Sequence, residues 1–85
     1  MTVAERIATY IANELLGDPT TTVAADENLL LSGRLDSIGV ISLVAFIESD
    51  LGVTVPPEDV IIDHFISIEA MVAYLAQRED AAPHA

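Results

Sequence analysis

Apolar residues recur every three or four positions in three separate stretches of the chain, which is the periodicity of amphipathic helices. The first stretch has an apolar stripe at four-residue spacing: Ile7, Ile11 and Leu15. Thr2 and Glu5 precede it with the spacing of a capping box, and Gly17 follows it as a C-terminal stop. This pattern predicts an N-terminal helix that ends at Gly17.

Residues 18–35 have no sustained periodicity and are predicted to form a long loop. Loops of this length in a small domain usually have a function or pack against themselves. Four leucines in it are expected to pack into one end of a helical bundle: Leu29, Leu30, Leu31 and Leu35.

The second periodic stretch predicts a helix from about Ser37 to Leu51, with Gly52 as its stop. At 100° per residue, five apolar residues share the face predicted to be the core: Val40, Leu43, Val44, Ile47 and Leu51. The opposite side carries Ile38, Ser42, Ala45 and Ser49, with Ile41 on one flank. Phe46 falls on the other flank, and the pattern leaves open whether it covers the long loop or is exposed.

The remaining chain predicts an extended linker at residues 53–55, a short helix at about 58–63 and a last helix capped by Ser67. The stripe of the last helix is Ile68, Met71, Val72 and Leu75. The predicted fold is all-α, a small antiparallel bundle of three main helices and one short helix.

One domain is expected for a chain of 85 residues, over residues 1–78, with a flexible C-terminal tail at 79–85. The chain has 14 acidic residues, three arginines and no lysine, for a net charge of −11. Such a charge repels nucleic acid and anionic lipids. It either attracts basic partner surfaces or only keeps the protein in solution. With no cysteine, no N-terminal signal region and no membrane-spanning apolar run, we expect a cytoplasmic, monomeric protein.

The start of the second predicted helix is the main candidate for chemistry, because a helix N-terminus stabilises a bound or attached phosphate. Ser37 stands there, and either it or Asp36 can instead serve only as the N-cap. Hydrolysis by a nucleophilic Ser37 is disfavoured, since the only histidines are His64 and His84.

No metal site is predicted. His64 lies beside Asp63 without a second cluster of ligands. The acids near the second helix do not have the spacing of a calcium loop: Asp26, Glu27 and Asp36. The remaining large side chains are expected in the core: Tyr10, Tyr74, Phe65 and Met71.

The stretch "LDSIGVISLVAFIESDLGVTVPPED" resembles the acyl carrier protein family, which includes peptidyl and aminoacyl carriers. That family has an Asp-Ser-Leu motif at the start of its second helix, written here Asp36-Ser37-Ile38. The resemblance extends to "LLLSGRL" before the serine and "DHFISIEAMVAYL" after it, and covers most of residues 3–78.

The resemblance implies a free-standing carrier that is not an enzyme. Ser37, with Asp36 as its neighbour in the motif, is expected to carry covalent 4′-phosphopantetheine. The terminal thiol of that arm explains how a chain without cysteine holds thioesters. The implied partners are a phosphopantetheinyl transferase, a loading enzyme (an adenylating ligase or acyltransferase) and a downstream synthase or transferase.

The resemblance also places Ile38, Ile41 and Ala45 where family members contact partner enzymes. The acids expected to meet basic partner surfaces are Glu48, Glu58, Asp59 and Asp63. The second helix lacks the acidic side chains usual in bacterial fatty-acid carriers, having Gly39, Val40, Ser42 and Ser49 instead. This departure argues against a housekeeping fatty-acid role, and the expected pathway is polyketide or nonribosomal-peptide-like. A fatty-acid carrier or an alanyl carrier is the alternative within the family. A cofactor-free helical adaptor is the alternative outside the family.

Overall fold

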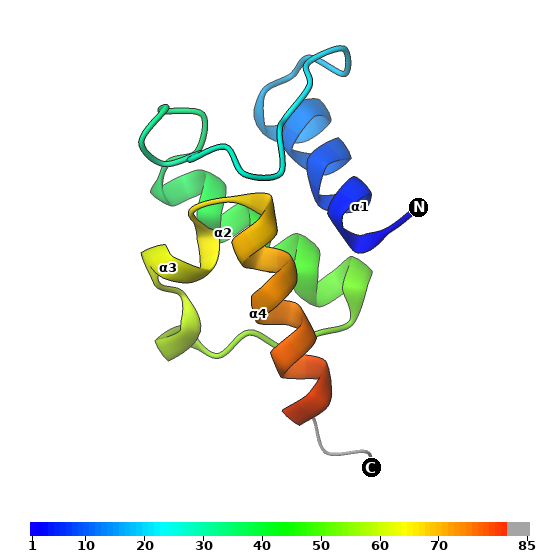
Figure 1. Ribbon diagram of the computed structural model, residues 1–85, viewed down its shortest axis with the longest axis vertical. Coiled ribbons are helices and arrows are strands. Elements are labelled where there is room, and N and C mark those ends of the chain that lie inside the picture. Colours follow the sequence, from blue (N-terminus) through cyan, green and yellow to red (C-terminus); the bar gives the residue numbers. More distant parts are fainter. Residues whose placement is uncertain (82–85) are drawn as a thin grey trace.

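The computed structural model describes the backbone of residues 1–81 and the side chains of residues 1–78. Residues 1–81 contain helices and no strand, which confirms the predicted all-α fold (Figure 1). The elements in chain order are α1 (Val3–Tyr10), η1 (Ile11–Leu15), α2 (Ser37–Phe46), η2 (Ile47–Leu51), η3 (Pro57–Asp59), α3 (Ile62–Phe65) and α4 (Ile68–Ala81). Helices α1 and α2 continue directly into the one-turn π-helical segments η1 and η2, so three long helices form the bundle.

The N-terminal helix has the predicted capping box. The Thr2 Oγ1 accepts a hydrogen bond from the Glu5 N–H (3.1 Å), and a Glu5 carboxylate oxygen accepts one from the Thr2 N–H (3.0 Å). Gly17 has a φ of +66°, the left-handed conformation in which glycine ends a helix without strain. Ile7 and Ile11 are completely buried, so the predicted stripe faces the core.

The core face of α2 is rotated from the predicted one. Leu43 and Ile47 are completely buried, as expected, but Val40 and Val44 are only half-buried. Gly39 is buried in their place, because Leu35 packs directly against it. A Cβ atom at Gly39 would lie 2.7 Å from the Leu35 Cδ1. The prediction missed this rotation because a glycine contributes nothing to an apolar stripe.

Phe46 takes neither of the two positions considered for it. Its ring stacks on Tyr10 of α1, with ring centroids 4.4 Å apart and an interplanar angle of 23°. Both residues are half-buried, so Tyr10 lies at the edge of the core rather than in it. The aromatic pair therefore closes one side of the α1–α2 contact.

The prediction of a single short helix at 58–63 is wrong. The structure has a 3₁₀ turn at η3 and a separate single turn at α3, with extended backbone at Ile61 (φ −123°, ψ 158°) between them. The Asp59 carboxylate accepts a hydrogen bond from Tyr74 of α4, at 2.6 Å. His64 Nδ1 lies 2.8 Å from the Asp59 carbonyl oxygen. These contacts fix the bend, and the local sequence pattern does not reveal them.

The last helix begins as predicted, because the Ser67 Oγ accepts a hydrogen bond from the Ala70 N–H (3.0 Å). Its residues Ile68, Met71 and Leu75 are buried, and Val72 is half-buried. Helix α4 packs against α1 and α3 (Figure 1). It continues to Ala81, past the predicted domain boundary at residue 78. Residues 82–85 of the predicted tail, including His84, lie outside the described residues.

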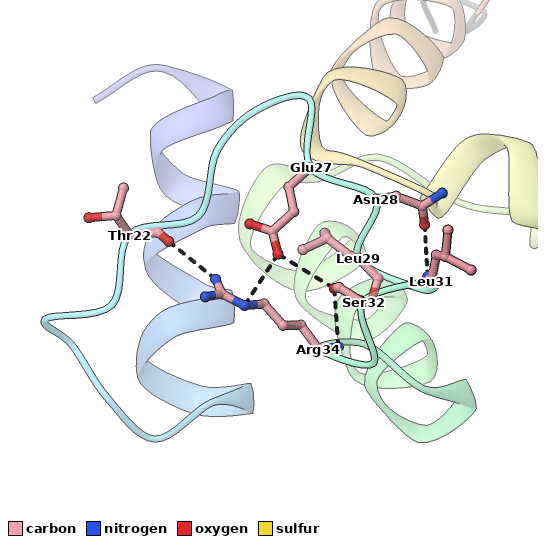
Figure 2. A network of polar contacts seen from close by, with 7 residues as sticks. All are labelled: Thr22, Glu27, Asn28, Leu29, Leu31, Ser32 and Arg34. Carbon is pink, nitrogen blue, oxygen red and sulfur yellow. Dashed lines mark hydrogen bonds and ion pairs between the residues drawn. The ribbon is translucent and has the colours of Figure 1, made fainter.

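The long loop between α1 and α2 is held together by its own polar contacts (Figure 2). Arg34 donates a hydrogen bond to the Thr22 carbonyl oxygen (3.2 Å), and its Nε lies 3.2 Å from a Glu27 carboxylate oxygen. Leu29 and Leu35 are buried and Leu30 is half-buried, as expected. Leu31 is instead 86% exposed, which contradicts its predicted packing into the bundle.

Candidate functional site

Ser37 is the first residue of α2, and it is exposed. The helix begins there because the preceding Asp36 has an extended backbone and its Oδ1 accepts a hydrogen bond from the Gly39 N–H at 2.8 Å. Asp36 is therefore the N-cap. Within residues 1–78, the Ser37 hydroxyl makes no hydrogen bond to another protein group, so it is available for chemistry.

The electrostatics at Ser37 suit a negatively charged group. The first backbone hydrogen bond of α2 runs from the Val40 N–H to the Asp36 carbonyl oxygen, at 2.9 Å. The N–H groups of Ser37 and Ile38 precede it and have no partner within the helix. They lie at the positive end of the helix dipole, where a phosphate is stabilised. The exposed hydroxyl and these donors together fit a phosphodiester at Ser37.

A groove of about 540 Å³ adjoins the first turn of α2. It lies between the end of the first helix, the turn before α2 and α2 itself. Its lining residues include the neighbours of Ser37 in sequence, Asp36 and Ile38, together with Leu16, Arg34 and Ser42. A group attached to Ser37 therefore has both this mixed polar and apolar surface and open solvent beside it.

Exposed apolar side chains follow Ser37 along α2 and occur in the neighbouring elements. Ile38 and Ile41 are 73% and 66% exposed, and Ala45 is exposed on the same side of α2. The structure adds three apolar side chains that sequence reasoning missed: Leu31, Ile61 and Ile62. The turn before α2, the start of α2 and α3 gather at one side of the molecule (Figure 1). Adjacent isoleucines at the start of a short helix were the only sequence signal for Ile61 and Ile62.

The four acids expected to meet partners fall into two groups. Glu58 and Asp63 are exposed. Glu48 is also exposed, but its carboxylate accepts a hydrogen bond from the Val55 N–H at 3.1 Å and so holds the linker after η2. Asp59 is half-buried and bound to Tyr74.

Tyr74 connects η3 and α3 to α4. Burial, together with the hydrogen bond to the Asp59 carboxylate, raises the pKa of the Tyr74 hydroxyl to about 12. Arg78 Nη1 lies 3.9 Å from that carboxylate, and the His64 ring stacks on the Tyr74 ring with centroids 4.3 Å apart. Asp59 therefore stabilises the bundle rather than standing free for a partner.

The chain belongs to a known family. The family model for the phosphopantetheine attachment site matches residues 5–75, which includes the start of α2. No curated protein matches the chain. Domains of this family carry 4′-phosphopantetheine covalently on a serine, and they are carriers rather than catalysts. They interact with the enzymes that modify them, such as a phosphopantetheinyl transferase. In the described part of the chain, no helix has the length and apolarity needed to cross a membrane.

Proposed function

We propose that Ser37 is the serine that carries 4′-phosphopantetheine in this chain. The observation that supports this is the exposed Ser37 hydroxyl at the N-terminus of α2, left free because Asp36 makes the cap. When bound, the arm supplies a terminal thiol that holds an acyl or aminoacyl group as a thioester. The unpaired N–H groups of the first turn stabilise the charge of the phosphodiester.

The exposed side of α2 supports a proposed partner surface formed by Ile38, Ile41 and Ala45. Apolar contacts there hold a partner enzyme close to the arm, since each covered side chain loses its contact with water. The exposed carboxylates of Glu58 and Asp63 attract basic partner surfaces over a longer range. The proposed partners are the transferase, a loading enzyme and a downstream synthase or transferase.

We infer a specialised pathway, polyketide or nonribosomal-peptide-like, from the exposed side of α2, which is apolar and has no acidic side chain. A carrier of fatty-acid synthesis or an alanyl carrier is the alternative within the family. Loading assays separate an aminoacyl carrier from an acyl carrier, because an adenylating ligase with an amino acid and an acyltransferase with a malonyl group give different mass gains on the arm. The absence of cysteine supports a reducing compartment, the cytoplasm.

Intact mass spectrometry tests the attachment site. The chain is incubated with coenzyme A, Mg²⁺ and a promiscuous phosphopantetheinyl transferase. The unmodified sequence and the Ser49→Ala control, which removes another exposed serine of the same long helix, should each gain one phosphopantetheine. The Ser37→Ala variant should stay helical by circular dichroism and gain nothing. Modification that survives Ser37→Ala places the site elsewhere, and a folded protein that never gains mass favours the cofactor-free adaptor.

A further inference from the structure

The turn before α2 holds an apolar side chain in solvent. Leu31 is 86% exposed, the largest exposed fraction among the large apolar residues of the described chain. Its neighbours Leu29 and Leu35 are buried. Figure 2 shows Leu31 on the side of the turn that faces away from α1. An isolated exposed leucine is common on protein surfaces, so its meaning depends on how the backbone under it is built.

That backbone is fixed by hydrogen bonds at both ends. The Leu29 N–H donates to the Ile66 carbonyl oxygen (2.8 Å), which ties the turn to the residue after α3. The Leu35 N–H donates to the Leu29 carbonyl oxygen (3.0 Å) and closes the turn just before α2. The turn that carries Leu31 is therefore tied to the segment after α3 and leads directly into α2.

The tip of the turn is also bonded. The Asn28 Oδ1 accepts a hydrogen bond from the Leu31 N–H itself, at 2.8 Å (Figure 2). The Ser32 N–H donates to the Asn28 carbonyl oxygen (3.0 Å), and Gly33 has a φ of +80°, which suits glycine. A backbone fixed in this way loses little conformational entropy when a partner covers Leu31, which favours binding.

The charges nearby identify the chemistry of the partner. Arg34, the basic residue of this loop, is turned inward to Thr22 and Glu27. The turn leads into α2 and is bonded to the residue after α3, and exposed carboxylates stand at the cap of α2 (Asp36) and in α3 (Asp63). A complementary surface has an apolar pocket for Leu31 with lysine or arginine side chains around it.

We propose that Leu31 is a recognition residue for the phosphopantetheinyl transferase that modifies Ser37, and that it inserts into such a pocket. This inference rests on the proposed function, since the enzyme must reach the Ser37 hydroxyl at the neighbouring helix start. It extends the partner surface from α2 to the turn that precedes it.

The test measures transfer kinetics with coenzyme A and a promiscuous phosphopantetheinyl transferase, followed by intact mass. Leu31→Gln should lower kcat/KM about fivefold or more through a higher KM, because a partly covered leucine contributes this much to binding. Leu31→Met should restore most of it. The control is Ala76→Gln, which places the same side chain at an exposed apolar position of α4.

The outcomes separate this inference from the proposed function. Equal kcat/KM values for Leu31→Gln and Ala76→Gln overturn the role of Leu31 while the wild-type mass gain still supports Ser37. A wild-type chain that gains no mass overturns the proposed function and this inference with it. Thermal unfolding should be unchanged for all three variants, because each replaced side chain is exposed, so a loss of transfer cannot be assigned to unfolding.

Discussion

The hydrogen bond between Tyr74 and Asp59 offers a quantitative test of how the bundle holds η3 in place. The Tyr74→Phe change keeps the ring and its stack on His64 but removes the donor to a carboxylate oxygen 2.6 Å away. A hydrogen bond to a charged group contributes about 1.5–3 kcal/mol when it is buried. The Asp59 side chain is 25% exposed, and Arg78 is near it. Water and Arg78 therefore offset part of the loss, and we expect a cost of about 1–2 kcal/mol.

That cost is measurable by urea and thermal unfolding followed by circular dichroism. For a chain of this size it corresponds to a fall in Tm of roughly 5–15 °C. The control is Tyr10→Phe, because the Tyr10 hydroxyl donates to the Ser42 carbonyl oxygen at a longer distance of 3.3 Å. We expect this control to lose less than about 1 kcal/mol. Equal losses for the two variants would refute the argument that the Asp59 contact is the stronger one.

The same contact predicts a pH dependence. The hydroxyl of Tyr74 has a pKa of about 12 in the folded chain and 10.0 when unperturbed. Between these values the unfolded state has lost the proton and the folded state keeps it, so stability falls as pH rises from 10 to about 12. Below pH 10 both states are protonated and this effect is absent. The Tyr74→Phe variant lacks this group, so its stability difference from wild type should shrink across that window. A constant difference would contradict the raised pKa.

Three further predictions follow from the geometry around α2. Gly39→Ala should lower the free energy of unfolding, measured by urea denaturation, by about 1 kcal/mol. The reason is that the clash with Leu35 outweighs alanine's better helix propensity. A gain in stability would show that the Leu35 side chain moves aside freely. Ile41→Glu should leave Tm nearly unchanged and slow cargo transfer to the cognate enzyme, whereas an unfolded variant would mean that the face of α2 is wrongly assigned. Raising salt to physiological strength should lower the association rate with a basic partner several-fold in surface plasmon resonance, since the Debye length falls to ~8 Å. The dissociation rate should change much less, and a steep rise would show that ion pairs, rather than apolar contacts, hold the complex.

The sequence alone was sufficient for features that depend on residues within one helical turn of each other. The capping box at Thr2, the cap at Ser67 and the helix start at Ser37 were all predicted from short spacings, and the structure has each of them. Apolar periodicity indicated the three long helices for the same reason. The family motif at Asp36 and Ser37 is equally local, so the order of residues is enough to locate the candidate attachment site.

Only the tertiary structure decided which of several similar residues face solvent. Leu29 and Leu31 are chemically identical neighbours, yet one is buried and the other exposed, because a hydrogen bond to Ile66 fixes the turn between them. The Asp59 carboxylate accepts a hydrogen bond from Tyr74, 15 residues later. The chain there forms two separate turns, η3 and α3, instead of the single predicted helix. Each of these outcomes depends on a contact with a residue far along the chain. The local pattern of apolar and polar positions does not predict such contacts.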